Sequence, residues 1–176
     1  MSELKVTPVQ PKPEFDVMYF LEICGESRIE QELLERLETA WNDWTDRMFA
    51  FKLIPSTAKN DEGFLFLYLS EGVENAVEEA WQKSPQEGMA FHNLAITLVM
   101  SSAQNVIPEL LDSCTPLPRP MGEVLDFFEA QGLEWNDQIG SINRQYAVYT
   151  PFPYRGGCEI CMQSDTCPNS TLRGNA

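Results

Sequence analysis

Three of the five cysteines in this 176-residue chain lie within ten residues near its C-terminal end. Cys158, Cys161 and Cys167 have the spacing C-x2-C-x5-C, and Pro168 follows the last of them. This spacing lets three thiolates converge on one point, and thiolates are ligands of zinc and of iron–sulfur clusters. Proline directly after a ligating cysteine is a habit of iron–sulfur sites. We therefore predict a metal centre in this loop, with a [4Fe–4S] cluster as the leading cofactor.

A four-thiolate site needs one more cysteine, and the chain offers two. Cys114 ends a predicted helical segment just before a proline-rich connector, where its side chain can face a nearby loop. Cys24 ends a predicted strand beside Gly25 and is equally suited to the core, since free cysteine is among the most buried residue types. We favour Cys114 as the fourth ligand and keep Cys24 as the alternative. Three protein ligands alone would leave one iron open to substrate or to cluster transfer.

Zinc is the alternative metal for the same loop. Structural zinc sites usually combine two C-x2-C pairs, or cysteine with histidine, into a tetrahedron. This chain has one such pair and a single histidine, His92, in the middle of a predicted helix. A third interpretation makes Cys161 or Cys167 a redox-active thiol. We rank it last, because the C-x2-C pair does not stand at a helix start after a strand, as a thioredoxin-like site requires.

The triplet resembles, at the level of this motif, the cysteines that close the [4Fe–4S] sites of three protein groups. These are endonuclease III-type DNA glycosylases, WhiB-like regulators and the auxiliary-cluster domains of radical enzymes. It is also similar to the end of the C-x4-C-x2-C-x5-C motif of a nitrogen-fixation molybdenum-donor family. The glycosylase, molybdenum-donor and auxiliary-cluster patterns have a further cysteine where this chain has Pro151, Pro153 and Thr171, respectively. The resemblance covers ten residues and implies a cluster-bearing loop, without implying any of those functions.

The chain is strongly acidic, with 12 basic residues against 27 acidic ones and a net charge of −15. Nucleic-acid binding requires lysine and arginine to displace counterions, so we expect neither a nucleic-acid partner nor attraction to an anionic membrane. Acidity serves solubility or docking on a basic protein partner. The stretch from Arg144 onward is less acidic, and Arg155 within it is predicted to offset the negative charge of a bound cluster.

The remaining motifs indicate a cytoplasmic protein that is not expected to be an enzyme. The N-terminal residues contain no apolar signal region, and the longest apolar run in a predicted helix, 94–100, is too short to cross a bilayer. Thiols stay reduced in the cytoplasm, so five cysteines there indicate metal or redox chemistry. The chain lacks a phosphate loop, a dinucleotide-binding glycine motif and an H-E-x-x-H zinc motif. With a single histidine, the chain has few residues that could act as the general base of a Ser/His or Cys/His catalytic arrangement.

Hydrophobic periodicity predicts the elements that must position these residues. We predict strands at 16–24, 48–54, 63–69 and 145–150. We predict helices at 28–46 and 121–131, two more that begin after Ser70 and Ser84, and a kink or restart at Pro108. Ser27 with Glu30, and Ser84 with Glu87, have capping-box spacing. The first half could form a split β-α-β unit of the ferredoxin-like type.

This order of elements indicates an α+β fold with a mainly antiparallel sheet packed with amphipathic helices and followed by a cysteine-rich metal-binding loop. We divide the chain into a flexible proline-containing arm (1–14), a single α+β domain (15–150) and a cysteine-rich loop and tail (151–176). The predicted function is that of an accessory protein that carries electrons or helps to assemble or deliver a metallocofactor. The alternative is a zinc-stapled protein-interaction or chaperone-like module.

Overall fold

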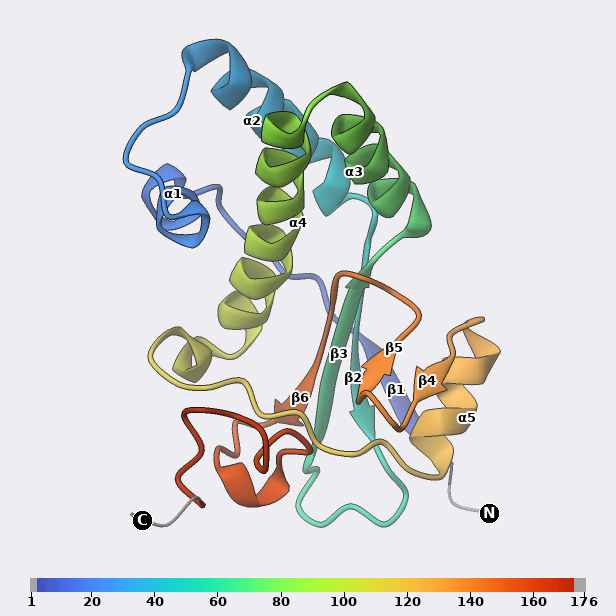
Figure 1. The fold of residues 1–176 in the computed structure, drawn as a ribbon. Coiled ribbons are helices and arrows are strands. Elements are labelled where there is room, and N and C mark those ends of the chain that lie inside the picture. Colours follow the sequence, from blue (N-terminus) through green and yellow to red (C-terminus); the bar gives the residue numbers. More distant parts are fainter. Residues whose placement is uncertain (1–2, 173–176) are drawn as a thin grey trace.

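The computed structural model describes residues 3–172 and has an α+β architecture built on an antiparallel sheet (Figure 1). The first half contains β1 (Lys5–Pro8), α1 (Val17–Cys24), α2 (Gln31–Thr45), β2 (Met48–Ile54), β3 (Gly63–Leu69) and α3 (Glu71–Lys83). The second half contains α4 (Pro85–Val106), α5 (Glu123–Ala130), β4 (Trp135–Asn136), β5 (Ser141–Ile142) and β6 (Ala147–Phe152). Two short 3-10 turns, η1 (Pro108–Leu111) and η2 (Cys158–Ile160), complete the set.

The main sheet has the strand order β1-β2-β3-β6, and every neighbouring pair is antiparallel. Phe66 of β3 stands opposite Phe51 of β2 on one side and Tyr149 of β6 on the other. Strands β4 and β5 form a separate two-stranded sheet. Within the arm predicted at 1–14, Lys5–Pro8 pairs with β2 and so supplies an edge strand of the sheet.

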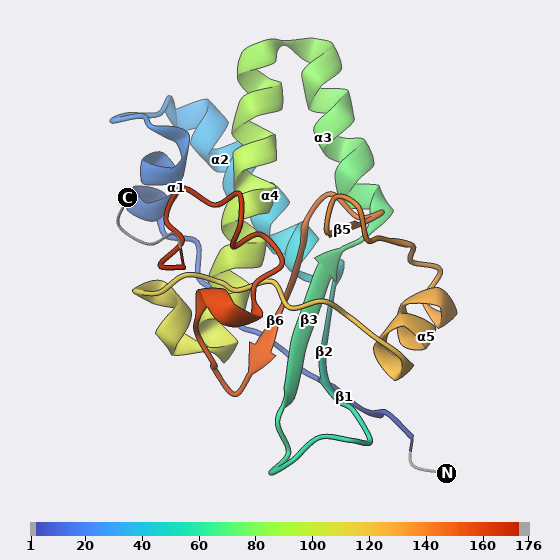
Figure 2. The same cartoon turned by 60° about the horizontal axis from the view of Figure 1, so that its bottom comes forward.

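Both faces of the sheet are covered, because successive side chains of a strand point to opposite sides. Leu65, Leu67 and Leu69 of β3 belong to one core cluster together with residues of α1, α2, α3 and α4. Phe66 and Tyr68 belong to a second cluster together with residues of α5 and β6. Figures 1 and 2 show α4 and α5 on opposite sides of the strands. The chain therefore has a three-layer arrangement with β3 buried in the middle.

The strand predicted at 16–24 is wrong, since these residues form helix α1. The Asp16 carboxylate accepts N–H groups from Met18 and Tyr19 and caps the helix, and Gly25 ends it with a φ of 68°. The aromatic and β-branched residues at 17–24 have a high strand propensity, which led to the strand prediction. The capping residues at both ends stabilise a helix instead. The split β-α-β unit is also excluded, since its predicted first strand is helix α1, and β1, the strand before the helices, pairs directly and antiparallel with β2.

The strands predicted at 48–54 and 63–69 have these bounds in the structure, and the other predicted elements are present with shifted boundaries. The helix predicted from 28 begins at Gln31, and no side-chain hydrogen bond caps it, so the Ser27–Glu30 capping box is not formed. Ser84 caps α4 as predicted, with its Oγ accepting the N–H of Glu87 at 3.1 Å. Pro108 ends α4 and starts η1. Within residues 3–172, no helix combines the length and apolar character needed to cross a membrane.

Candidate metal centre

The proline-rich connector at 115–120 runs beside the cysteine-rich loop that follows β6 (Figure 2). The Leu117 carbonyl accepts the backbone N–H of Met162 at 2.8 Å. The buried Thr150 of β6 donates its hydroxyl to the Pro116 carbonyl at 2.9 Å. The connector is therefore held both to the sheet and to the loop, and this brings Cys114, three positions before Leu117, to the cysteine-rich end of the fold.

Two of the three loop sulfurs accept backbone hydrogen bonds. Cys161 Sγ accepts the N–H of Leu117 at 3.5 Å, and Cys158 Sγ accepts the N–H of Thr171 at 3.4 Å. The turn between the first two cysteines is closed by the Cys161 N–H, which donates to the Cys158 carbonyl at 3.2 Å. Backbone N–H groups aimed at sulfur are outer contacts that orient and stabilise thiolate ligands in metal sites. The loop thus has an environment suited to thiolates.

The four cysteines also influence one another electrostatically. Partial desolvation raises the pKa of the Cys114 thiol, and the negative charges of neighbouring thiolates raise it further. Those thiolates belong, in order of effect, to Cys161, Cys158 and Cys167. Hydrogen bonding from Thr171 lowers the pKa of Cys158. Cys114 therefore lies within the electrostatic reach of all three loop cysteines, while Thr171 stabilises the thiolate of Cys158.

The sulfurs do not form a closed coordination shell. Among residues 3–172, no group of three or more cysteine, histidine, aspartate or glutamate side chains is placed to hold a metal ion. The cysteine-rich loop is present, and the metal site predicted in it stays a prediction. All five cysteines are free thiols; Cys114 is exposed, and the other four are partly exposed.

The other two predicted site residues have separate environments. Cys24 ends α1, accepts a hydrogen bond from the Asn93 amide at 3.4 Å and packs against the first core cluster. Burial raises its pKa, and the loop cysteines are not among the groups that act on it. Arg155 forms an ion pair with Glu62 at 3.0 Å, with both side chains about half exposed. The charge of Arg155 is therefore already compensated in part by a carboxylate of the β2–β3 loop.

Sequence reasoning did not identify Leu117 and Thr171 as contacts of the cysteine sulfurs. The sequence did contain a signal for Leu117. Pro116 and Pro118 have no N–H, so Leu117 is the only backbone donor among residues 116–118. Nothing in the sequence marks Thr171. His92 of α4 has its Nδ1 within 2.8 Å of the hydroxyl of Tyr146, the residue before β6.

Comparison with known proteins gives this chain no family: no family model matches it, and no curated protein matches it. The cysteine-rich end of the fold and the chemistry of its donor atoms are therefore the main indications of function. Those donors are four thiols drawn from two segments that hydrogen bonds hold together.

Proposed function

We propose that the protein is a metal-binding accessory protein that carries electrons or helps to assemble or deliver a metallocofactor. Its cofactor would be a [4Fe–4S] cluster held by four cysteines, namely Cys114, Cys158, Cys161 and Cys167. The observation that carries this proposal is the attachment of the connector to the loop through Leu117. The hydrogen bond from Leu117 to Cys161 joins segments that lie 44 positions apart, and this supports Cys114 as a fourth ligand beside the triplet.

The residues present fit such a cofactor. The loop consists of turns and one 3-10 turn, and its cysteines are partly exposed, so their side chains can change rotamer without disturbing the core. The N–H groups of Leu117 and Thr171 already point at sulfur and would stabilise the charge of bound thiolates. A [4Fe–4S] cluster bound here would supply one-electron transfer, with a potential set by these hydrogen bonds and by solvent exposure.

The same four thiols also fit zinc, which takes four cysteines in a tetrahedron. Zinc would then staple the connector to the loop, and the protein would be an interaction or chaperone-like module without catalytic activity. In both versions the proposal places the protein in a reducing compartment such as the cytoplasm, because free thiols persist there. The net charge of −15 favours a protein partner over a nucleic acid.

The test is to purify the full chain without oxygen and to record its visible spectrum with its iron, sulfide and zinc content. A broad absorbance near about 400 nm with roughly four irons and four sulfides per chain would support the cluster. A colourless protein with about one zinc per chain would support the staple instead. A chain that binds neither metal, even after anaerobic incubation with iron and sulfide or with zinc, would overturn the proposal.

A further inference from the structure

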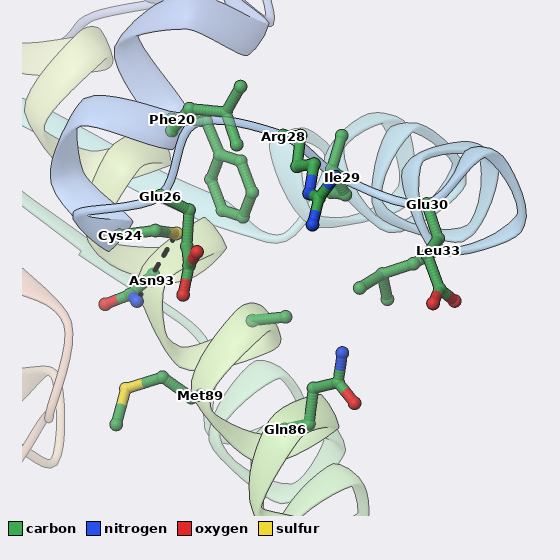
Figure 3. A pocket seen from close by; sticks show the side chains of 12 residues that line it. Phe20, Cys24, Glu26, Arg28, Ile29, Glu30, Leu33, Gln86, Met89 and Asn93 are labelled. Atoms are coloured by element: carbon green, nitrogen blue, oxygen red, sulfur yellow. Dashed lines mark hydrogen bonds between the residues drawn. The ribbon is translucent and has the colours of Figure 1, made fainter.

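Two adjoining hollows lie on either side of helix α1, and we call them together the α1 groove. The first has a volume of about 600 Å³ and lies between α1, the segment at 25–30, α2 and α4 (Figure 3). The second has a volume of about 570 Å³ and lies between α1, α4 and η1. Leu21 and Glu26 line both hollows, so the groove is continuous around the C-terminal half of α1.

Apolar side chains form part of the floor of the groove. Phe20, Ile29 and Leu33 lie around the first hollow, as Figure 3 shows. Large apolar side chains at the groove are also exposed: Met18 by 74%, Met89 by 51% and Leu111 by 66%. Single exposed apolar residues are ordinary, but three around one groove form a patch that favours a partner. Methionine is common on such surfaces, because its flexible side chain adapts to the contour of a bound helix.

The rim of the groove is acidic. Glu26 and Glu30 border the first hollow, and Asp16, Glu22 and Glu26 border the second. Among the residues that the structure describes, Arg28 is the one basic residue that lines either hollow. Within residues 3–172, no ion pair engages Glu22, Glu26 or Glu30. These carboxylates are available to pair with the positive charges of a ligand, and apolar surface between acidic rims selects a basic amphipathic partner.

We propose that the α1 groove binds a basic amphipathic helix of a partner protein. The apolar stripe of that helix would lie on the floor beside Met89 and Met18, and its lysines and arginines would face Glu22, Glu26 and Glu30. This is helix-in-groove recognition, in which residues spaced i, i+3, i+4 and i+7 act as anchors. Cys24 lines the first hollow, but none of the four cysteines proposed as metal ligands lines either hollow, so the inference does not depend on the metal.

Other occupants fit the groove less well. A second copy of this chain would bring another protein with a net charge of −15 against an acidic rim, and like charges oppose that contact. An anionic bilayer would be repelled for the same reason. The charge of the rim therefore selects a cationic helix among the surfaces that could cover the apolar floor.

The test uses the full chain and a fluorescein-labelled synthetic peptide of leucine and lysine, about 18 residues long, or five helical turns. Its leucines follow the i, i+3, i+4 pattern, and a second peptide has the same composition in an order that gives no apolar face. Binding is measured by fluorescence anisotropy in about 0.15 M salt, where long-range attraction is largely screened. Two variants alter the groove, M89S and E26K. Two matched controls, M121S and E79K, change exposed residues away from the groove. Met121 lies just before α5, and Glu79 lies in α3.

We expect the patterned peptide to bind wild type and both controls alike, and M89S and E26K to bind it about tenfold more weakly. The scrambled peptide should bind wild type at least about tenfold more weakly than the patterned one. Equal weakening by E26K and E79K, or equal binding of both peptides, would show attraction to net charge alone and would overturn the proposal. Self-association that M89S abolishes, without peptide binding, would make a second copy the occupant and would also overturn it.

Discussion

The backbone N–H of Leu117 donates to the sulfur of Cys161 across 3.5 Å, while the Leu117 carbonyl accepts the N–H of Met162 at 2.8 Å. Leu117 of the connector therefore makes two hydrogen bonds with the loop, one to the backbone of Met162 and one to the sulfur of Cys161. Pro116 and Pro118 on either side have no N–H, so neither can replace Leu117 as the donor. Because Cys114 lies three residues before Leu117, the hydrogen bonds of Leu117 hold the segment that carries Cys114 beside the loop that carries the triplet.

The first prediction concerns this donor. L117P removes the N–H and should weaken metal binding by about 10- to 100-fold, which is the usual cost of losing an outer contact to a ligand. L117A keeps the N–H and loses only the packing of a partly buried side chain against the second core cluster. Competition with a chromophoric chelator measures both affinities. Equal metal affinity of L117P and L117A would contradict a role for the hydrogen bond.

The second prediction separates the two candidate fourth ligands. C114S should lower the bound metal and bleach any visible absorbance, because it removes the thiol that lies within electrostatic reach of the triplet. C24S is the matched control, since Cys24 is hydrogen-bonded to Asn93 and packs against the core away from the loop cysteines. Metal analysis of both anaerobically purified variants gives the answer. Unchanged metal content in C114S would remove Cys114 from the ligand set.

The elements with one dominant local signal were predictable from the sequence. Ser84 followed by Pro85 predicted the start of α4, and the two apolar runs at 48–54 and 63–69 predicted β2 and β3. Residues 16–24 carried two competing signals. The side chains at 17–24 favour strands, whereas Asp16 before them and Gly25 after them are helix caps, and the caps match the structure.

Long-range contacts explain what the sequence could not show. Strand β1 is exposed along its whole length, so it has no alternating pattern, and only its pairing with β2 identifies it. The spacing of the cysteine triplet is local and was readable, but the approach of Cys114 depends on tertiary hydrogen bonds made by Leu117 and Thr150. The pairing of Arg155 with Glu62 is likewise a tertiary contact between two loops.

The third prediction concerns the ion pair that ties α3 to the segment before β6. Arg144 donates to Glu74 at 2.8 Å, and the Gln145 N–H donates to the same carboxylate at 2.7 Å. Both charged side chains are less than one-fifth exposed, so R144A leaves a poorly solvated carboxylate and should cost about 2 kcal/mol of unfolding free energy. R119A is the control, because its pair with Asp137 is more than half exposed and should contribute at most about 0.5 kcal/mol.

Urea unfolding of the two arginine variants, followed by circular dichroism, provides the comparison. R144A should lose more unfolding free energy than R119A. Equal losses would mean that the partly buried Arg144–Glu74 pair contributes no more to stability than the exposed Arg119–Asp137 pair.

The fourth prediction compares two serines at helix N-caps. Ser84 Oγ accepts the Glu87 N–H at 3.1 Å, whereas Ser70 stands at the N-cap of α3 without a side-chain hydrogen bond. S84A should therefore destabilise the fold by about 1 kcal/mol, and S70A by no more than a few tenths. Thermal melts of both variants measure the difference. A greater loss in S70A would show that the capping geometry does not control the stability of these helices.

The fifth prediction is a pH dependence at the start of α5. The Glu123 carboxylate accepts the Ser56 N–H at 2.9 Å and also the Ser56 hydroxyl, and these hydrogen bonds lower the pKa of Glu123 below its usual value of 4.5. A carboxyl whose pKa is lower in the folded state adds stability above the pKa of the unfolded state. That stability is lost as the pH falls through the lower, folded value.

E123Q removes this titration, so wild type should be more stable than E123Q near neutral pH. The advantage should diminish once the pH falls below 4.5, where the unfolded carboxyl takes up a proton before the folded one. S56A is the control, because it keeps the backbone donor and should lose only part of the same advantage. Melting temperatures between about pH 7 and pH 3 test this. An advantage of wild type that grows as the pH falls would show that Ser56 does not stabilise the charged form of Glu123.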